Sequence, residues 1–422
     1  MISANEFKER RNKVLEAMDD YSVAIMFCGV AKKRSEDEGY DFLGNRNFYY
    51  LTGIEQENSV LVLVKSAGNF KEYLFINEYN PVFEKWYGKR LTIEEATKVN
   101  SIDNCLYINA LDAKLSTILD DNGDEKSLVN NVYLDFDSEQ KIKEGLFIEQ
   151  YIESLKANYS NKEFKNIYPI LAKLRMVKST NEIEEFKEAV SKTNIGIRNL
   201  MKALKPGLNE YQLYSLFYYT IQDYDFSELS FHTICASGVN ATTLHYPNPT
   251  GKVNDGDLIL FDLGSKNNGY CADISRTFPV NGKFNDLQKK IYSIVLGCNK
   301  MIIDKVRPGI TLEELNNYAK DYLAEGCLKE GLIESKDEIS NYYFHHVSHY
   351  IGLDTHDISF SRNEPLQPGN IISDEPGLYF KELGIGVRIE DDILVTEDGS
   401  YNLSGNIIKE IADIEKAMAL RK

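Results

Sequence analysis

The sequence predicts an α/β (α+β) protein with two domains, and three observations support this prediction. The chain has 422 residues, enough for two or three domains of the usual size of roughly 150 residues. Its first third alternates short runs rich in Val, Ile, Phe and Tyr with amphipathic segments, which is the pattern of strands and helices. Near residue 170 this alternation gives way to a long helical segment. We therefore place the domains at 1–170 and 171–422.

The first domain is expected to open with a charged amphipathic helix at 7–18, and a further helix is expected at 92–99. Several short apolar segments have the length and composition of strands. These predicted strands are 22–27, 48–51, 60–64, 73–76 and 132–136. The pattern is that of an α/β domain and by itself indicates no function.

The second domain opens with a helix that has a start signal. Ser179 and Glu182 have the spacing of a capping box, in which the N-cap hydroxyl and the N3 carboxylate each accept a backbone N–H. The apolar residues that follow recur at helical spacing. They form one face, made of Ile183, Phe186, Val190 and Ile197.

The second domain also contains a short internal repeat. The segments 205–209 (KPGLN) and 307–311 (RPGIT) each place a Pro-Gly turn before a helix N-cap, 102 residues apart. The segments 256–262 and 369–375 each run from a turn glycine through an apolar strand to a carboxylate, 113 residues apart. Such short matches can also arise from turn chemistry alone. We interpret them as two successive units of similar length.

The composition excludes several classes of protein. Asp and Glu number 65 against 48 Lys and Arg, a formal charge of −17, which repels phosphate backbones and anionic lipids. The longest apolar run, 23–30, is far shorter than the roughly 20 residues of a membrane span, and the first residues lack the apolar core of a signal peptide. The six cysteines are dispersed, with no pair at zinc or redox spacing. We expect a cytoplasmic protein that binds neither nucleic acid nor membrane.

Two pairs of carboxylates stand symmetrically about predicted hairpin turns. Asp262 and Asp273 flank a polar four-residue turn, and Glu375 and Glu390 flank a second one. In simple hairpins the members of each pair would face each other across the ladder, with their Cβ atoms roughly 5 Å apart. Like charges so placed are destabilising unless a cation lies between them or one carboxyl stays protonated. The alternative is that all four are solvent-facing strand residues.

The histidines are concentrated near these hairpins. None of the six precedes residue 232, and four fall in the segment 344–357, FHHVSHYIGLDTHD. Carboxylates with one or two imidazoles suit Mn²⁺, Co²⁺, Fe²⁺ or Zn²⁺. Four carboxylates carry too much negative charge for one divalent ion, so two ions that share carboxylates fit better, and such sites activate water. The pattern predicts a hydrolase with a two-metal site.

Five motifs follow one another in the second domain, namely FDLG, YCADISRTF, HHVSHYIGLDTHD, DEPGLY and VRIEDD. They resemble the motifs of the pita-bread metallopeptidases, and among these the aminopeptidase P (Xaa-Pro aminopeptidase) family. In the first domain, RRNKVLEAM followed by NRNFYYLTGIEQ resembles the creatinase-like N-terminal domain of that family. The resemblance implies a creatinase-like α/β domain followed by a pita-bread domain with an internal pseudo-twofold repeat. His346 is a departure, because many bacterial members have Gly at this place.

The resemblance also implies roles for individual residues. The metal ligands would be Asp262, Asp273, His349, Glu375 and Glu390. The substrate-binding residues would be His245, His345 and His356, together with Trp86, an aromatic residue that in bacterial members reaches a neighbouring subunit's active site. The catalytic set would be Glu375, His356, His245, His345 and Arg388. For Trp86 the alternative is a place in the domain core.

The function implied by the resemblance is that of an aminopeptidase that hydrolyses the N-terminal Xaa-Pro bond of peptides with a metal-bridging hydroxide. Two divalent ions are expected, Mn²⁺ in first place and Co²⁺, Zn²⁺ or Fe²⁺ as alternatives. The partners would be peptides with proline at the second position, and the protein would be a homodimer or homotetramer. The nearest alternative is prolidase, which cleaves only Xaa-Pro dipeptides. A more distant alternative is a non-catalytic pita-bread binding protein, which the five filled ligand positions disfavour.

Overall fold

The computed structural model describes residues 2–120, 129–136, 141–143, 145–225 and 227–420. Contacts divide the chain into two compact units, Met1–Arg175 and Met176–Lys422. Helix α7 (Tyr168–Met176) spans the predicted boundary at 170/171. None of the helices in the described ranges is both long enough and apolar enough to cross a membrane.

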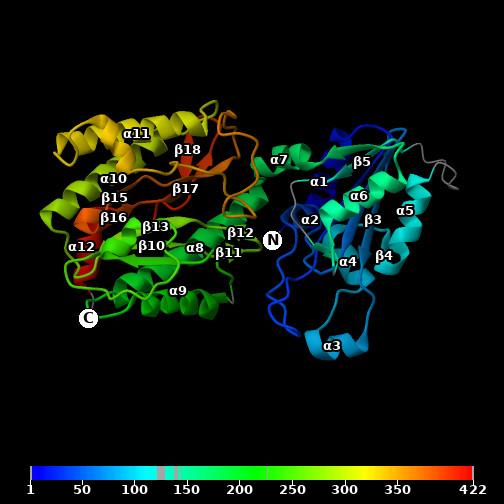
Figure 1. The fold of residues 1–422 in the computed structure, drawn as a ribbon, viewed down its shortest axis with the longest axis horizontal. Helices are drawn as coiled ribbons and strands as arrows, with labels where there is room; N and C mark the ends of the chain where they lie inside the picture. Colours follow the sequence, from blue (N-terminus) through cyan, green and yellow to red (C-terminus); the bar gives the residue numbers. More distant parts are fainter. Residues whose placement is uncertain (1, 121–128, 137–140, 144, 226, 421–422) are drawn as a thin grey trace. The chain divides into compact units, whose positions relative to one another are not determined.

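The N-terminal unit is built on a six-stranded mixed sheet in the order β4-β3-β2-β1-β5-β8. Helices α5 and α6 lie against this sheet (Figure 1), and buried apolar side chains of its central strands pack against them. The strands are β1 (Ser22–Phe27), β2 (Val60–Ser66), β3 (Asn69–Ile76), β4 (Cys105–Tyr107), β5 (Asn131–Leu134) and β8 (Glu163–Asn166), with a separate pair β6 (Lys141–Lys143) and β7 (Leu146–Phe147). The helices are α1 (Ala4–Ala17), α2 (Arg46–Thr52), α3 (Pro81–Tyr87), α4 (Ile93–Asn100), α5 (Leu111–Leu119) and α6 (Ile148–Asn158).

Most of the predicted elements of this unit are confirmed, and one is wrong. The helices at 7–18 and 92–99 correspond to α1 and α4, and all predicted strands except one correspond to β1, β2, β3 and β5. The segment 48–51 is instead part of helix α2. Its N-cap Asn45 accepts the backbone N–H of Phe48, and Gly53 ends the helix at a φ of 65°. The caps decide the conformation, because a short apolar run fits a strand or a helix equally well.

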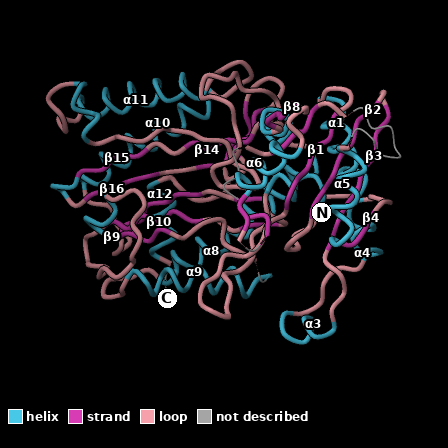
Figure 2. Tube along the Cα trace, turned by 45° about the vertical axis from the view of Figure 1, so that its right-hand side comes forward, coloured by secondary structure: helices cyan, strands magenta, loops and turns pink. Residues whose placement is uncertain are grey.

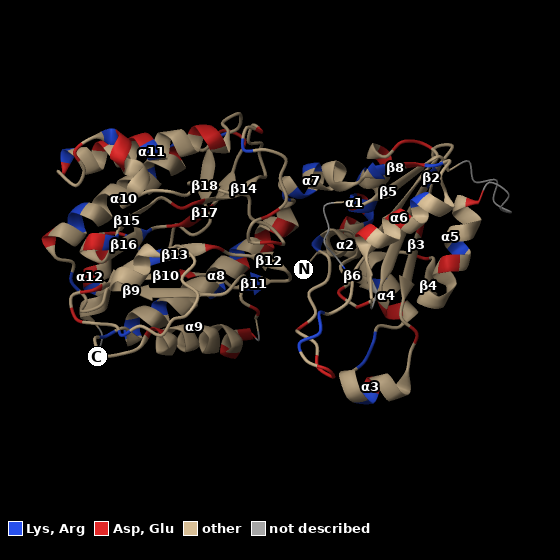
Figure 3. Ribbon diagram, viewed as in Figure 1, with Lys and Arg blue, Asp and Glu red and all other residues tan. Residues whose placement is uncertain are grey.

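In the C-terminal unit, strands lie between two pairs of long helices, α8 and α9 on one side and α10 and α11 on the other (Figures 1 and 2). Acidic and basic side chains are mixed along α11 (Figure 3). The helices are α8 (Thr180–Ala203), α9 (Glu210–Asp225), α10 (Asp286–Lys305), α11 (Leu312–Lys329) and α12 (Ile411–Ala419). The strands are β9 (Ile234–Ser237), β10 (Leu258–Leu263), β11 (Lys266–Asn267), β12 (Tyr270–Cys271), β13 (Ile274–Pro279), β14 (Ile371–Asp374), β15 (Gly377–Phe380), β16 (Ile385–Arg388), β17 (Asp391–Val395) and β18 (Ser400–Asn402).

Helix α8 begins as the sequence predicts. Ser179 Oγ accepts the N–H of Glu182 at 3.2 Å, and Glu182 Oε2 accepts the N–H of Ser179 at 2.9 Å. Phe186, Val190 and Ile197 of the predicted apolar face are buried. The capping box therefore fixes the start of the helix, and burial of one face fixes its orientation.

The internal repeat is confirmed by backbone hydrogen bonds that recur in both halves of the unit. In each half, the Pro-Gly turn before the second helix pairs with the segment that leads into the first strand of the long hairpin, β10 or β14. The bonds, all 2.8 Å long, are Gly207 N–H to Val253 O and Val253 N–H to Leu208 O in the first half, and Gly309 N–H to Leu366 O and Leu366 N–H to Ile310 O in the second. The partners keep the offsets of 102 and 113 residues seen in the sequence. Chance turn chemistry does not reproduce this pairing.

Each half contributes one long hairpin, and the register of the first differs from the predicted one. β10 and β13 pair with Asp262 opposite Ser275, not opposite Asp273. The predicted four-residue turn is a two-residue turn, because its first two residues continue the ladder as β11. The turn residues Asn268 and Gly269 take φ values of 47° and 86°, which are typical of tight hairpin turns. The shorter turn moves Asp273 out of line with Asp262 and into the break between β12 and β13.

The second hairpin has the predicted register. β15 pairs with β16, and β14 pairs with β17, on one continuous antiparallel register in which Gly377 lies opposite Arg388. On that register Glu375 and Glu390 are opposite each other, as predicted. They lie in the break between the two parts of the ladder. Both hairpins are thus interrupted where acidic side chains stand.

Candidate metal centre

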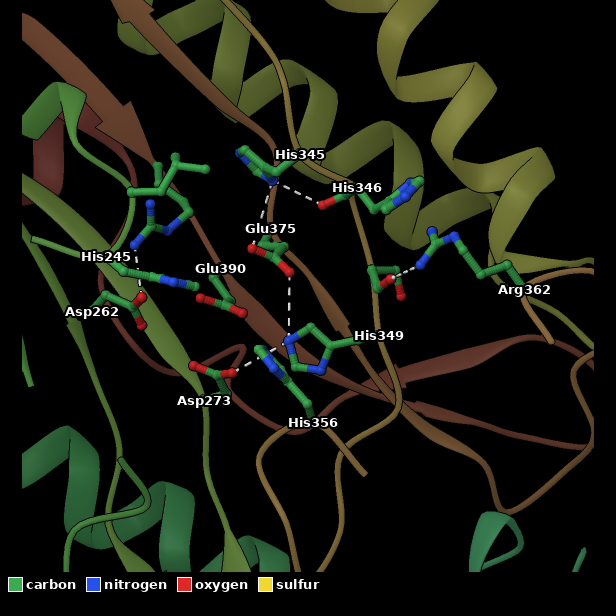
Figure 4. Close-up of a pocket in the computed structure, with 13 residues that line it drawn as sticks. His245, Asp262, Asp273, His345, His346, His349, His356, Arg362, Glu375 and Glu390 are labelled. Atoms are coloured by element: carbon green, nitrogen blue, oxygen red, sulfur yellow. Dashed lines mark hydrogen bonds and ion pairs between the residues drawn. The ribbon is translucent and has the colours of Figure 1, made fainter. Parts of the chain in front are cut away.

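A cavity of about 280 Å³ lies in the C-terminal unit and is lined by both hairpins. It brings together all the residues predicted as metal ligands and most of those predicted to act on substrate (Figure 4). The lining consists of Leu244, His245, Asp262, Asp273, His345, His346, Ser348, His349, His356, Arg362, Glu375, Arg388 and Glu390. We therefore regard this cavity as the candidate functional site.

Backbone contacts outside the ladders hold the residues that stand in the hairpin breaks and in the histidine segment. Two backbone N–H groups donate to carbonyl oxygens, that of Glu375 to Val347 O (2.9 Å) and that of Glu390 to Ser275 O (3.0 Å). Two others donate to side chains, that of His349 to Ser373 Oγ (2.9 Å) and that of Asp273 to Asp392 Oδ2 (3.3 Å). Asp262 is different, because it lies within the paired strand β10. Side chains in a break are freed from the strict alternation of a strand, so several of them can face the same cavity.

The imidazole of His349 and the carboxylates converge in the cavity (Figure 4). His349 Nε2 lies 3.4 Å from Asp273 Oδ2 and 3.4 Å from Glu375 Oε1. Asp273, His349 and Glu390 each offer one ligand atom, and these three atoms lie within 4.8 Å of one another. Protein atoms that share one cation at bond lengths of about 2.0–2.2 Å are similarly spaced.

Burial makes the negative charge of these carboxylates unfavourable. The pKa of Asp273 is raised well above its ordinary value by burial first, and then by the charge of Asp262. The pKa of Glu390 is likewise raised well above its ordinary value, by burial and then by the charge of Asp273. Burial also raises the pKa of Glu375, although the positive charge of His349 would act in the opposite direction. A bound divalent cation reverses this situation by favouring the ionised forms.

Asp262 keeps one ligand atom without a partner. Its Oδ2 accepts a hydrogen bond from Arg388 Nη2 at 2.7 Å. Its buried Oδ1 has no hydrogen-bond partner in the part of the chain that the structure describes. A buried acceptor left in this state costs roughly 1–3 kcal/mol, and a metal bond would satisfy it. The set of four carboxylates and one imidazole therefore fits divalent cations that prefer oxygen and nitrogen ligands.

Arg388 and Ser275 link the acidic residues of the two hairpins. Arg388 Nε donates to Ser275 Oγ at 2.8 Å, and this hydroxyl donates to Glu390 Oε2 at 2.7 Å. Because Arg388 also binds Asp262, one chain of contacts joins Asp262 of the first hairpin to Glu390 of the second. Contacts of this kind orient metal ligands and tune metal affinity.

His345 is held in its neutral form. Burial lowers its pKa to about 3, and the positive charge of Arg388 acts in the same direction. Its Nδ1 lies 2.8 Å from the carbonyl oxygen of His346, so Nδ1 carries the proton, and its Nε2 accepts the hydroxyl of Tyr379 at 2.9 Å. Tyr379 in turn accepts a hydrogen bond from Arg388 Nη1 at 3.1 Å. Both ring nitrogens of His345 are therefore engaged.

His356 and His245 also line the cavity. Burial lowers the pKa of His356 to about 4, and the neighbouring His349 and His245 act in the same direction. The ring centroid of His356 lies 4.4 Å from that of His349. His245 comes from the loop between η2 (Gly238–Thr242) and β10. An imidazole N–H at either place can donate a hydrogen bond to a substrate oxygen.

The structure places Trp86 in helix α3 of the N-terminal unit. Its side chain is 77% exposed, so the alternative that it is a core residue is wrong. Its contact with substrate stays a prediction. His346, the departure from the bacterial pattern, is exposed and lines the cavity together with Arg362.

Sequence reasoning missed Ser275, Tyr379 and Arg362. Ser275 lies two residues after Asp273, and this alternation was the one available signal for it. Tyr379 lies on β15 opposite Gly386, and nothing in its spacing points to His345. Ser275 contacts Glu390 of the other hairpin, Tyr379 contacts His345, and Arg362 donates to Ser348 O. These contacts join segments far apart in the sequence, which no local pattern reports.

A second cavity, of about 390 Å³, is formed beside the first and shares His245, Asp262, Asp273 and His356 with it. The remaining lining is largely apolar or aromatic and consists of Phe231, His232, Ile234, Tyr246, Pro247 and Thr355. The acidic cavity therefore continues into a space suited to an apolar group.

Known proteins resemble the chain over its whole length. Residues 184–397 match metallopeptidase family M24, and residues 7–128 match the aminopeptidase P N-terminal domain. The Xaa-Pro aminopeptidases of Haemophilus influenzae and Escherichia coli K12 are each 32% identical to this chain. The alignments cover 99% and 100% of this chain and 98% and 99% of those proteins.

Solved structures agree with this assignment. A Bacillus anthracis protein assigned to aminopeptidase P has a TM-score of 0.95 at 40% identity, with 100% of both chains covered. Zinc-substituted E. coli aminopeptidase P in complex with product has a TM-score of 0.89 at 31% identity, with 100% of this chain and 99% of that chain covered. The predicted fold class and the family resemblance are therefore confirmed. The chain belongs to metallopeptidase family M24, as a member with an N-terminal domain of the aminopeptidase P type.

Proposed function

We propose that this protein is a dinuclear aminopeptidase that hydrolyses the N-terminal Xaa-Pro bond of peptides. The observation that carries the proposal is the convergence of Asp273, His349 and Glu390, with ligand atoms within 4.8 Å of one another, in a buried acidic cavity. Relatives named Xaa-Pro aminopeptidase align over the whole chain, which supports the same substrate class. The ligands would be Asp262, Asp273, His349, Glu375 and Glu390.

The ligand set favours two ions, because four carboxylates balance the charge of two divalent cations. Such ions, Mn²⁺ first and Co²⁺, Zn²⁺ or Fe²⁺ as alternatives, would supply an activated water and polarise the attacked carbonyl. Oxygen-rich sites favour Mn²⁺ over metals that prefer thiolates. The contacts of Arg388 with Asp262 and Ser275 would hold two carboxylates in position for this task.

Residues at and around the ligands would bind the carbonyl oxygen of the substrate and transfer the proton of the attacking water. Glu375, whose pKa is raised mainly by burial, would take the proton of the attacking water and pass it to the departing proline nitrogen as the C–N bond breaks. His356, assisted by His245, would donate a hydrogen bond to the carbonyl oxygen as negative charge develops there. His345 and Arg388, which are joined by their hydrogen bonds to the hydroxyl of Tyr379, would complete the catalytic set.

The substrate would be recognised at both sides of the scissile bond. Its free amine would lie near Asp262, which makes the enzyme an exopeptidase. The amide nitrogen of proline carries no hydrogen, so a site for it needs apolar walls and no acceptor. The apolar cavity beside the ligands, with Phe231, Ile234 and Pro247, supports this expectation.

We also propose that the protein works in the cytoplasm as a homodimer or homotetramer, with Trp86 reaching the site of a neighbouring subunit. All six cysteines are buried and form no disulfide, as is usual in a reducing compartment. The large exposed fraction of Trp86, 77%, leaves its indole available to another subunit.

One assay panel tests the proposal and separates it from prolidase, the nearest alternative. Metal-stripped protein is offered Xaa-Pro dipeptides and Xaa-Pro-Yaa tripeptides, with Mn²⁺, Co²⁺ or Zn²⁺ restored singly. We expect tripeptide cleavage that depends on metal, with two ions bound per chain. Cleavage of dipeptides alone would indicate a prolidase, and full activity without metal would overturn the proposal.

A further inference from the structure

Glu210 is a fully buried carboxylate outside the metal centre. It is the first residue of α9 and has no exposed surface. No cation contacts its carboxylate within the described ranges. A buried charge is costly unless hydrogen bonds compensate it, so the partners of this group indicate what it does.

The carboxylate of Glu210 ties together the two ends of one loop. Its Oε1 accepts the backbone N–H of Ser237 at 2.7 Å and the side-chain amide of Asn240 at 2.9 Å. Its Oε2 accepts the backbone N–H of Gly251 at 2.7 Å, and the N–H of Glu210 donates back to Gly251 O at 2.9 Å. Hydrogen bonds to an ionised acceptor are stronger than neutral ones. The two ends of the loop 237–251 are therefore joined through one residue, Glu210.

Gly251, where the loop closes, is tightly surrounded by other side chains. A Cβ atom on Gly251 would lie 2.4 Å from Asn240 Nδ2 and 2.7 Å from Glu210 Oε2, so a larger residue would displace one or both of these side chains. The charge of Glu210 also acts on Tyr246, in the middle of the loop. Burial, and then this charge, raise the pKa of the Tyr246 phenol.

The loop carries His245, which lines both cavities. No hydrogen bond to its imidazole is formed among the residues that the structure describes. Its neighbours Leu244 and Tyr246 pack against a cluster that includes Leu260 and Tyr379. The position of the imidazole thus depends on the backbone of the loop and not on hydrogen bonds of the ring.

The internal repeat shows that the fold does not require a charge at this place. The offset of 102 residues that relates the two Pro-Gly turns relates Glu210 to Leu312, the first residue of α11. Leu312 is buried and apolar. The carboxylate is therefore a feature of the half that presents His245.

We propose that Glu210 is a positioning residue, which closes the loop 237–251 and thereby holds His245 in place for contact with the substrate. This inference rests on the proposed function for the role of His245. Gln at this position would have the same size but would turn an N–H group toward at least one of the three donors, leaving that donor unpaired.

A double-mutant cycle on the Mn²⁺-loaded protein tests the inference. We expect Glu210→Gln to lower kcat for an Xaa-Pro-Yaa tripeptide by about 10–100-fold, since displacement of a group that contacts substrate costs up to about 10²-fold, with bound metal unchanged. In a His245→Ala background the same change should lower kcat by less than about threefold, because coupled residues are not additive. Equal losses in both backgrounds, or no loss in either, would overturn the inference.

A further pair of variants controls for misfolding, and a further measurement needs no substrate. Gly251→Ala disturbs the closure from the other side and should reproduce the loss in kcat, whereas Glu314→Gln, the same change at the start of α11 on an exposed side chain, should not. Hydrogen exchange of the amides of Ser237 and Gly251 should be faster in Glu210→Gln. If the wild-type protein cleaves no Xaa-Pro peptide, the proposed function fails, and the exchange rates alone then decide whether Glu210 closes the loop.

Discussion

The two hairpins of the C-terminal unit supply their acidic residues in different ways. In the first hairpin, Asp262 stands within a paired strand and Asp273 in the break of the ladder. In the second, Glu375 and Glu390 both stand in the break. Each hairpin also braces the other, because Arg388 of the second binds Asp262, and Ser275 of the first binds Glu390. The site is therefore one structure completed by two halves and not two half-sites placed side by side.

Loss of one acidic side chain from the first hairpin is the most severe way to break this arrangement. We expect Asp273→Ala to abolish peptide hydrolysis and to lower the metal content, because the remaining residues no longer balance two divalent ions. Metal analysis of the purified variant and peptide turnover measure both effects. Asp321→Ala, on the exposed face of α11, is the control. An Asp273→Ala protein with full activity after metal stripping would contradict the metal assignment.

Removal of His356, which we propose to contact the substrate, should separate catalysis from metal binding. We expect His356→Ala to lower kcat by about 10²–10³-fold, the usual cost of a lost hydrogen-bond donor to a developing oxyanion. Bound metal should remain near the wild-type level. Steady-state kinetics with metal analysis on the same sample checks this, and an unchanged kcat would remove His356 from the catalytic set.

The hydrogen bond by which Ser275 of the first hairpin braces Glu390 of the second should affect metal affinity more than the rate of hydrolysis. Ser275→Ala removes the hydroxyl that donates to Glu390 Oε2 at 2.7 Å, and we expect Mn²⁺ affinity to fall by about 10–100-fold. Titration calorimetry on metal-free protein measures it. Ser293→Ala, exposed on α10, is the matched control, and equal affinities in the two variants would show that the brace does not tune the site.

Without metal, the protein should become less stable as pH rises. The pKa values of Asp273 and Glu390 are raised in the folded state, chiefly by burial. The folded state therefore binds more protons than the unfolded state above the ordinary carboxyl pKa of about 4, and stability falls with rising pH. The lowered pKa values of His345 and His356 add stability as pH rises to about 6.5. We therefore expect the Tm of metal-free protein to decrease above about pH 6.5, up to about pH 8, and Mn²⁺ to restore it.

Variants show which hairpin causes this pH dependence. Asp273→Asn and Glu390→Gln should each flatten the decline in Tm of the metal-free protein. A decline that is as steep in both variants as in the wild type would mean that these carboxyls do not cause it.

The smallest expected effect is a difference in stability between alanine variants of two turn glycines at equivalent positions in the two halves. Gly256 and Gly369 have φ values of 83° and 89°, so alanine at either position should cost about 1–2 kcal/mol in backbone strain. A Cβ on Gly256 meets open space, whereas one on Gly369 lies 3.0 Å from Val177 Cγ1 and 3.1 Å from Lys178 O. Urea unfolding should show the larger loss for Gly369→Ala. Equal losses would mean that the second turn relaxes freely.

The sequence predicted local features better than pairings. The capping box at Ser179 and the register of the second hairpin needed only short-range rules, and both hold in the structure. The first hairpin was misaligned because the positive φ of Asn268 allows a tighter turn than its polar composition suggested. The strand predicted at 48–51 failed because its composition gave no sign of the flanking caps.

The site itself was predicted only in part. Like-charged pairs near a cluster of histidines pointed to a metal centre, and the structure brings these residues into one cavity. Their roles as ligands came from the family resemblance and stay predictions. The contact of Ser275 with Glu390 depends on how one hairpin packs on the other, and that of Tyr379 with His345 on how the histidine segment packs on the second hairpin. The alternation of a single strand reports neither.

The division of the ligands between two halves has a consequence for biosynthesis. Glu390 follows Asp262 by 128 residues in the sequence, so at about 5–20 residues per second the ribosome adds it roughly 6–25 s later. During that interval the first two aspartates can offer a passing cation only an incomplete set of oxygens. If the predicted ligand set holds the metal, selection among competing metals would therefore fall to a late step of maturation, when the second half docks on the first.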